Sequence, residues 1–195
     1  MNTQPLLDYI RTYIDLNAEE EALLLSKITT RNYLKNQFIV QQGDVCKHIN
    51  FILSGCARTF HVDASGHEHV VFFSVENWWT SDLCSFLGKS PADFNIQCVE
   101  PTQLVQFEKE TLEQLYNEIP KLERLFRKIT ERGFVASQKR IVRNFSLDAK
   151  ARYVIFKNTY PQIEQRVPQY MIASYLGISK EFLSKIKKQL LHGEE

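Results

Sequence analysis

The polar side chains with the most regular spacing in this sequence lie near its C-terminal end. If residues 180–190 form a helix, Leu183, Ile186 and Leu190 share one buried face at positions i, i+3 and i+7. Lysine can donate hydrogen bonds to guanine, and glutamate can accept one from cytosine, so such side chains on the opposite face could read base edges. That face carries Lys180, Glu181, Ser184, Lys185, Lys187 and Lys188.

The residues before this segment are typical of a helix-turn-helix. Pro168 can begin a first helix, and Ala173 is small enough for two helices to cross closely. Gly177 can adopt the left-handed conformation that the turn requires, and Ser179 can cap the second helix. A lysine-rich helix alone would suit a solvated surface equally well, but this ordered set is more restrictive. We therefore predict a helix-turn-helix that binds double-stranded DNA, with inward positions at Ile172, Ala173, Leu176 and Ile178.

Two kinds of DNA contact are expected from this motif. The N-terminal part of a recognition helix faces base edges in the major groove. We assign base reading to Lys180, Glu181, Ser184 and Lys185. Phosphate contacts position a protein on the duplex without specifying its sequence. We assign these contacts to Arg166, Gln169, Tyr170, Ser179, Lys187 and Lys188.

A second constellation could bind a metal ion. His67 and His69 flank Glu68, and this spacing places two imidazoles on one side of a strand, as in a cupin-like metalloenzyme. Such a site needs a further glutamate and histidine, yet no histidine occurs between His69 and His192. A solvent-facing hairpin after Gly66 is the favoured alternative. Because there is also no Gly-rich phosphate loop and no Ser/His/Asp or Cys/His set, we predict no catalytic residues, no metal and no cofactor.

The four cysteines also lack the spacing of metal ligands. Cys46, Cys56, Cys84 and Cys98 form no CxxC pair, so neither a zinc site nor a redox motif is indicated. In a reducing cytoplasm we expect all four to be buried as small apolar residues.

Helical and strand patterns indicate which elements would position these residues. Residues 3–29 have a helical pattern, with Asn17 as an N-cap that three glutamates follow within the first turn. Six short β-rich runs then alternate with turn signals, which is typical of an antiparallel sandwich, barrel or jelly roll. The runs are 38–40, 49–53, 57–62, 69–75, 96–99 and 103–107.

The pattern returns to helical after the last of these runs. A short helix over 108–116 precedes a long one that extends from Pro120 to about Asn144. A further helix over 146–159 stops before Pro161. A helix of about 25 residues spans ~37 Å, so we predict that its apolar seam pairs two copies as a homodimer, the alternative being a core helix of a monomer. The predicted dimer residues are Leu122, Phe126, Ile129, Gly133 and Ala136.

Charge is distributed unevenly along the chain. The 195 residues carry 24 Lys+Arg and 23 Asp+Glu, which gives a net charge of +1. Residues 1–115 contain 8 Lys+Arg and 15 Asp+Glu (net −7), whereas residues 116–195 contain 16 and 8 (net +8). The basic half is therefore expected to meet a polyanion. No apolar run reaches the length of a membrane span, and the first residues lack a signal-peptide pattern, so we expect a cytoplasmic protein with no membrane partner.

Together these features resemble the Crp/Fnr transcriptional regulators over nearly the whole chain. Gly43-Asp44, the turn at 52–55 and the hairpin at 63–66 are similar to that family's cyclic-nucleotide-binding-like β-roll. LGISKEFLSKIKKQL at 176–190 is similar to the family's recognition segment. The resemblance implies an α+β fold with an antiparallel β-roll (double-stranded β-helix) sensor domain over 1–115, a long dimerisation helix over 116–145 and a helix-turn-helix domain over 146–195.

The resemblance also implies how such a protein would act. Members bind a palindromic operator as homodimers, with RNA polymerase as a partner, and residues matching Lys180, Glu181 and Lys185 read base edges. Many members continue into a β-hairpin wing. Only Leu191–Glu195 follow the recognition segment here, so we expect the wing to be absent.

The sequence departs from the family where a cyclic nucleotide would bind. Members that bind this ligand carry a Gly-Glu pair and, a few residues on, an arginine that holds the cyclic phosphate. Here Ser81-Asp82 and Ala92-Asp93 stand at those positions, and Lys89 offers only a point charge. We therefore predict that cyclic-nucleotide binding is lost. No cysteine cluster precedes Cys46, so an iron–sulfur centre is not expected either.

The aromatic residues of the first half leave two interpretations open. They can form the core of the β-roll, or they can line a site for an apolar or uncharged small-molecule effector whose pocket residues the sequence does not identify. The residues in question are Phe72, Phe73, Trp78, Trp79, Phe86 and Phe94.

Overall fold

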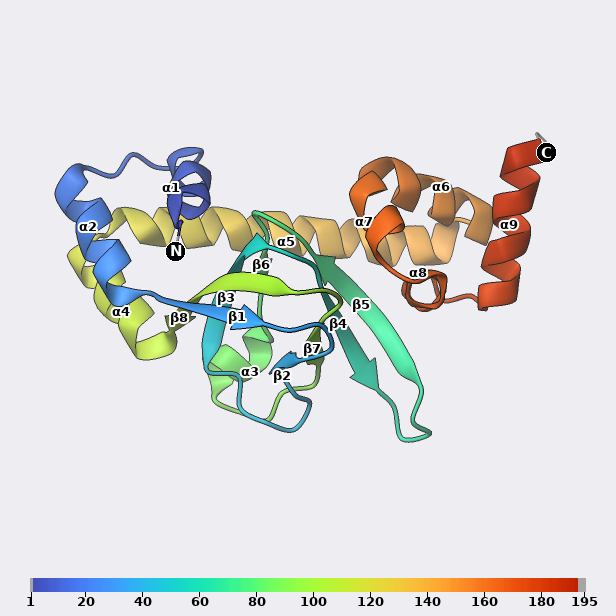
Figure 1. The fold of residues 1–195 in the computed structure, drawn as a ribbon, viewed down its shortest axis with the longest axis horizontal. Coiled ribbons are helices and arrows are strands. Elements are labelled where there is room, and N and C mark those ends of the chain that lie inside the picture. The colour runs from blue at the N-terminus through green and yellow to red at the C-terminus, as the bar shows by residue number, and fades with distance from the viewer. Residues whose placement is uncertain (1, 193–195) are drawn as a thin grey trace.

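A computed structural model describes residues 2–192 and shows a β-roll, a long helix and a C-terminal group of helices (Figure 1). The long helix α5 (Lys121–Ser146) runs past the β-roll and carries the chain to the C-terminal helices. This arrangement confirms the α+β fold expected from the sequence. Among the residues described, no helix has the length and apolar character needed to cross a membrane.

Two helices precede the β-roll, and both lie within residues 3–29, which were expected to be helical. They are α1 (Gln4–Arg11) and α2 (Ala18–Lys27). The predicted cap at Asn17 is confirmed. The Asn17 side chain accepts a hydrogen bond from the Glu20 N–H at 2.8 Å, and the Glu20 carboxylate accepts one from the Asn17 N–H at 2.8 Å. This reciprocal pairing satisfies two amide groups at the start of α2.

The β-roll consists of two four-stranded antiparallel sheets, ordered β1-β8-β3-β6 and β2-β7-β4-β5. Six strands match the predicted runs to within one residue at each end. β1 and β6 were missed, because β1 is polar on both faces and β6 has only two residues. The strands are β1 (Thr29–Tyr33), β2 (Phe38–Val40), β3 (His48–Ser54), β4 (Ala57–Val62), β5 (Glu68–Ser74), β6 (Trp79–Thr80), β7 (Asn95–Cys98) and β8 (Thr102–Glu108).

Helices cover the outer face of the first sheet. The ring of Phe126 on α5 lies 6.2 Å from Phe107 of β8 and 5.0 Å from Trp79 of β6, measured between ring centroids. Tyr9 of α1 packs on Phe51 of β3 at 5.3 Å. Side chains alternate across a strand, so the residues between these aromatic positions face the space between the two sheets.

The predicted dimer seam is wrong in its N-terminal part. Leu122 is 1% exposed and belongs to the hydrophobic core of its own chain, which begins at α1 and includes α4 (Lys109–Glu118). Phe126 and Ile129 are partly buried against the same core. Gly133 and Ala136 are exposed. The first half of α5 is therefore used to complete the β-roll domain.

The C-terminal helices share a second hydrophobic core with the β-roll. Phe73 of β5 lies 6.3 Å from the ring of Phe156 and 5.6 Å from that of Tyr175. The helix starting at Pro161 was missed, because this proline ends one helix and also occupies the first turn of the next, where its missing N–H is tolerated. The helices are α6 (Ala149–Thr159), α7 (Pro161–Arg166), α8 (Gln169–Leu176) and α9 (Lys180–His192).

Candidate nucleic-acid interface

α8 and α9 form the predicted helix-turn-helix. Gly177 ends α8 with φ +67°, in the left-handed region, and the Ile178 N–H donates to the Ala173 carbonyl at 3.0 Å. The Ser179 hydroxyl accepts a hydrogen bond from the Phe182 N–H at 3.1 Å, which caps α9 as predicted. These bonds satisfy carbonyl and amide groups that helix ends leave free, and they fix the turn between the two helices.

Apolar side chains hold the two helices together. Leu183 and Ile186 of α9 are buried as predicted, at 0% and 2% exposed. Leu190 was expected on the same buried face but is 37% exposed, because α9 extends beyond the shared core, whose last member is Ile186. The inward positions of α8 are buried as predicted at Ile172, Ala173 and Leu176, and Ile178 is partly buried. The C-terminal stretch predicted to lack a wing lies mostly at 193–195, outside the described residues.

Five polar side chains on the outer face of α9 have no partner within the described part of the chain. Lys180, Glu181, Lys185 and Lys188 are exposed, and Ser184 is partly exposed. Within residues 2–192, none of these five side chains takes part in a hydrogen bond or an ion pair. α9 also stands at the end of the molecule, away from the β-roll (Figure 1). These side chains are therefore free to meet a large ligand.

Arg166, predicted to contact a phosphate, is paired with two carboxylates of its own chain. Its Nη1 and Nη2 atoms donate to the Glu76 carboxylate at 2.7 and 2.9 Å, and Nη2 also donates to Glu100. Hydrogen bonds to these two carboxylates raise the pKa of Arg166 above its ordinary value. The side chain fastens α7 to the loops that follow β5 and β7.

Lys187 is also engaged within the chain and is withdrawn from the set of phosphate contacts. Its Nζ lies 3.0 Å from the Glu164 carboxylate and 5.7 Å from the ring centroid of Tyr153. The positive charge of Lys187 on α9 is thus balanced by the carboxylate of Glu164 on α7. Gln169 and Tyr170, at the exposed start of α8, remain candidates for phosphate contact together with Lys188.

Polar contacts fix α8 on the edge strand β5. The Ser174 hydroxyl accepts a hydrogen bond from the Val70 N–H at 2.9 Å and donates to the Glu68 carbonyl at 2.8 Å. Arg140 of α5 donates to the carbonyls of Val70 at 3.3 Å and Tyr175 at 3.1 Å. Burial lowers the pKa of Arg140, although nearby tyrosines oppose this effect. The β-roll therefore determines the position of the helix-turn-helix through direct contacts.

The His67/His69 pair lies on the exposed β4–β5 hairpin. Asp63 binds it there, with an Oδ2 to His69 Nε2 distance of 2.7 Å, and this hydrogen bond lowers the pKa of Asp63. Among the described residues, no group of three or more His, Cys, Asp or Glu side chains could hold a metal ion. The pair is thus part of a hairpin, the alternative favoured from the sequence.

The cysteines are buried except for one. Cys46, Cys56 and Cys98 are buried, and burial raises the pKa of the Cys56 thiol to about 12. The prediction was wrong for Cys84, which is exposed on the short helix α3 (Leu83–Gly88). A turn of helix on the surface of the roll presents that side chain to solvent.

Most of the aromatic residues proposed as pocket lining belong to cores instead. Phe86 is 2% exposed, and Trp79 packs between Phe107 and Phe126. Phe72, which is 43% exposed, lies near the Arg140 guanidinium at 5.9 Å from the ring centroid. The interpretation of these residues as core is therefore correct for the larger part of the set.

The loop that would bind the phosphate of a cyclic nucleotide contains a buried carboxylate of the chain itself. Asp82 is 2% exposed and caps α3, accepting a hydrogen bond from the Ser85 N–H at 3.0 Å. Its other oxygen accepts hydrogen bonds from the N–H groups of Asp93 at 2.9 Å and Phe94 at 3.2 Å. An anion already satisfies these three amide groups, so a phosphate would have to displace it.

Replacing Asp82 with alanine is expected to destabilise the fold by about 2 kcal/mol, because one buried and two partly buried N–H groups lose their acceptor. Urea unfolding followed by circular dichroism measures this change. Asp93→Ala is the matched control, since the Asp93 side chain is exposed and only its backbone contacts Asp82. If the two variants have equal stability, the buried carboxylate does not hold the loop.

Comparison with known proteins agrees with this architecture. Residues 30–118 match the cyclic nucleotide-binding domain. The transcriptional activator proteins Anr of Pseudomonas aeruginosa and Pseudomonas protegens are each 22% identical over an alignment of 165 positions that covers 78% of this chain and 66% of theirs. The matched part is thus slightly less than two thirds of those relatives.

Solved structures show the same fold. The c-di-GMP-responsive global regulator CLP of Xanthomonas campestris superposes with a TM-score of 0.73 at 17% identity, covering 91% of this chain and 93% of CLP. FixK2 of Bradyrhizobium japonicum superposes with a TM-score of 0.71 at 14% identity, covering 85% of each chain. The chain thus contains a segment similar to the cyclic nucleotide-binding domain and has the fold of these two solved regulators, with a β-roll, a long helix and a helix-turn-helix.

Proposed function

We propose that this protein is a transcriptional regulator that binds palindromic operator DNA as a homodimer and is not an enzyme. The observation that carries the proposal is the exposed, unpaired polar face at the start of α9, presented by a helix-turn-helix. The curated relatives are named transcriptional activators, which supports a regulatory function. The site of action would be the cytoplasm, with RNA polymerase as a further partner.

The roles of individual residues follow from their positions on the two helices. Lys180, Glu181, Ser184 and Lys185 occupy the first two turns of α9 and would read base edges in the major groove. Gln169, Tyr170 and Lys188 flank that face and would contact phosphates. The Ser179 hydroxyl already caps α9, so its contribution is to position the helix.

The second half of α5 is the surface that we propose joins two copies. Phe134, Ile141 and Phe145 are 63%, 56% and 87% exposed and follow one another at i, i+7 and i+11, so they lie on one face of the helix. Val135 and Val142 extend this face and are 46% and 62% exposed. A second copy of the same helix would cover these side chains and place two α9 helices on one duplex. This face, defined as the five residues above, replaces the seam expected from the sequence.

Cyclic-nucleotide binding is proposed to be absent. The Asp82 carboxylate accepts the three backbone hydrogen bonds described above, and no arginine stands at the position of the phosphate-binding residue. A phosphate in this loop would face both Asp82 and the exposed Asp93, and like charges repel it.

Selection of duplexes from a random-sequence pool, followed by fluorescence anisotropy at several salt concentrations, tests the proposal. A palindrome with half-sites about 34 Å apart is expected. The logarithm of the binding constant should fall with the logarithm of salt concentration by about 0.9 per neutralised phosphate. Failure to enrich any sequence, together with salt-independent binding, would exclude this function.

Lys180→Ala and Lys188→Ala should affect the selected operator differently. Loss of Lys180 removes a base contact, so the preference at one base pair of each half-site should fall by about 1–3 kcal/mol. Loss of Lys188 removes a phosphate contact, so all sequences should bind more weakly by a similar factor and the salt slope should fall by about 1 per contact. Anisotropy with a set of single-base operator variants measures both effects. The roles are misassigned if Lys180→Ala weakens all variants alike.

A further inference from the structure

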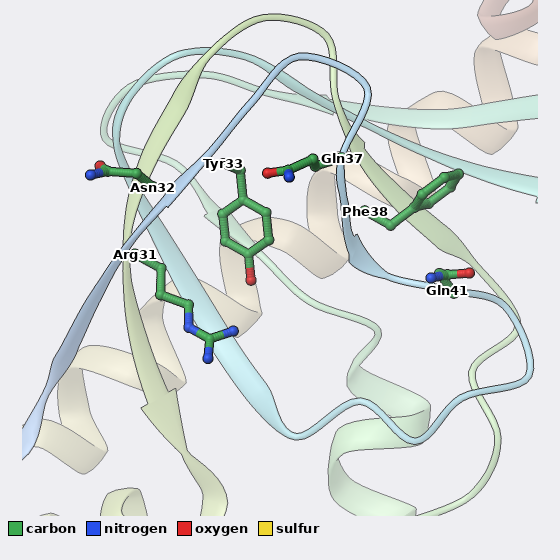
Figure 2. A pocket seen from close by; sticks show the side chains of 6 residues that line it. All are labelled: Arg31, Asn32, Tyr33, Gln37, Phe38 and Gln41. Atoms are coloured by element: carbon green, nitrogen blue, oxygen red, sulfur yellow. The ribbon is translucent and has the colours of Figure 1, made fainter.

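An open hollow lies between the edges of the two sheets, where β1 and β2 face each other. Its outer part, of about 560 Å³, is lined by Arg31, Asn32, Tyr33, Gln37, Phe38 and Gln41 (Figure 2). Its inner part, of about 310 Å³, shares four of these residues and continues between the sheets. The inner part adds Val40, Asp44, Cys46, Lys47, His48, Asn50 and Gln106, among others.

The strand alternation directs specific side chains into this hollow. Arg31 and Tyr33 are two residues apart on β1, and Figure 2 shows both side chains extending into the space while Asn32 points away from it. Arg31 pairs in register with Leu104 of β8, next to the pair formed by Asn50 and Gln106. The side chains of β1 therefore stand over the inner residues of β3 and β8.

The inner wall of the hollow consists of buried amides. Asn50 is 0% exposed and Gln106 is 4% exposed. The Gln106 Nε2 donates to Asn50 Oδ1 at 2.9 Å, and the Asn50 Nδ2 donates to the Thr80 carbonyl at 3.1 Å. The Gln106 Oε1 accepts no hydrogen bond from any described residue. This oxygen is not one of the fully buried atoms that lack a partner, so it is open to the hollow and can accept a hydrogen bond from a ligand hydroxyl.

The charges around the hollow include an unpaired cation. Within the part of the chain that is described, the Arg31 guanidinium has no hydrogen-bond or ion-pair partner. Burial lowers the pKa of His48, while Glu108, at 3.6 Å, opposes this effect. Lys47 and Asp44 lie at the rim with opposite charges. Lys47 also lacks a partner among the described residues but lines only the inner part, whereas Arg31 lines both parts of the hollow.

We propose that this hollow binds a small polyhydroxylated anion, such as a sugar phosphate or a sugar acid. The Arg31 fork suits a phosphate or carboxylate group, which it can bind through two parallel hydrogen bonds. The amides of Gln37, Gln41 and Gln106 offer donors and acceptors for hydroxyl groups, which both donate and accept. Tyr33 adds a flat ring and a hydroxyl.

This site adjoins the loop that Asp82 closes, since the Cys46 N–H donates to the Ser85 hydroxyl at 2.8 Å, but the two open at different places. The hollow opens between β1 and β2, whereas Asp82 lies at the start of α3 and binds residues 93–94. The inference concerns the β-roll and does not rest on DNA binding, so its test contains no DNA.

Titration calorimetry with the full chain tests the proposal using glucose 6-phosphate, gluconate and uncharged glucose. Saturable binding of at least one anion is expected, with glucose at least tenfold weaker. Arg31→Gln should weaken the anion about tenfold, in line with the loss of a charge-assisted hydrogen bond. Arg124→Gln is the matched control, because it removes the same charge from an exposed residue of α5 that does not line the hollow. The Arg124→Gln variant should bind the anion with the same affinity as the unmodified chain.

Amide chemical shifts then locate the bound anion. The expected changes lie at 31–33 and 37–41, and Gln106→Leu should reduce binding by about fivefold through the lost acceptor. Binding by glucose 6-phosphate alone or gluconate alone identifies which anionic group is recognised. The proposal is overturned if neither anion binds, if glucose binds equally well, if Arg31→Gln has no effect, or if the shifts occur at 82–94 instead.

Discussion

Replacing Ile141 with glutamate is expected to convert the proposed dimer into monomers and to weaken operator binding by about 100-fold or more. Ile141 lies near the middle of the exposed apolar face of α5, between Phe134 and Phe145. A carboxylate there would meet its symmetry mate across the two-fold axis, where both charges would be desolvated and would repel each other. Two linked half-sites gain about 10²–10⁴ in affinity over one, and this gain would be lost.

Light scattering and operator anisotropy measure the two consequences of Ile141→Glu together. Lys139→Gln is the matched control, since it changes the net charge by the same unit and lies about 200° around the helix from Ile141. The control should remain dimeric and bind the operator nearly as well as the unmodified protein. A dimeric Ile141→Glu variant would show that the exposed face of α5 is not the joining surface.

The position of this face explains why the sequence predicted a different seam. An apolar 3–4 pattern over Leu122, Phe126 and Ile129 is equally compatible with a dimer contact and with packing in the same chain. Which of the two occurs depends on α1, β6 and β8, which supply Tyr9, Trp79 and Phe107 from distant parts of the sequence. Periodicity therefore predicted the helix and its apolar character, but not the partner of each residue.

Local signals predicted the helix-turn-helix well. The conformation of Gly177, the cap at Ser179 and the burial of Leu183 depend on residues a few positions away, so their signals are contained in the segment. The pairing of Arg166 with Glu76 spans 90 residues, and no pattern within 160–190 indicates it. The helix-turn-helix could be predicted, whereas its attachment to the β-roll could not.

The same limit applies to the β-roll. Strands with alternating or continuous apolar runs were predicted closely, but the polar strand Thr29–Tyr33 was missed because its pairing with β8, and not its composition, makes it a strand. The hollow that it borders was missed for the same reason. Arg31 acquires its position between the sheets only through that pairing.

Replacing Arg166 with glutamine is expected to destabilise the attachment of the C-terminal domain to the β-roll by about 2 kcal/mol at pH 7. The change leaves Glu76 and Glu100 close together without the cation between them. Loss of one partner of a buried ion pair costs about 3–5 kcal/mol, and the smaller value expected here reflects the partial exposure of all three side chains. Urea unfolding measures the loss. Proteolysis at the end of α5 reports whether the C-terminal domain separates first.

The pH dependence of Arg166→Gln distinguishes an electrostatic clamp from simple loss of packing. Burial alone would raise the pKa of Glu76, but hydrogen bonds from Arg166 and the Gly55 N–H outweigh it and lower this pKa below the ordinary value of 4.5. A carboxyl with a lowered folded-state pKa stabilises the fold above its unfolded-state pKa, and this contribution is lost as pH falls through the folded-state pKa. In the variant the two carboxylates repel each other, and protonation removes the repulsion. The stability difference between the two proteins should therefore shrink from about 2 kcal/mol at pH 7 toward zero below about pH 4.

A charge-neutral variant completes this test. The triple variant Arg166→Gln, Glu76→Gln, Glu100→Gln removes both the cation and the repulsion, so it should recover part of the lost stability at pH 7. Its stability should also depend less on pH than that of the unmodified protein or of Arg166→Gln. Because α7 carries Arg166 and leads directly into α8, a weaker clamp should also loosen the position of α9 relative to the β-roll. Operator affinity should then fall in Arg166→Gln and be partly restored in the triple variant. An Arg166→Gln variant with unchanged stability at both pH values would mean that the shared apolar core alone holds the C-terminal domain on the β-roll.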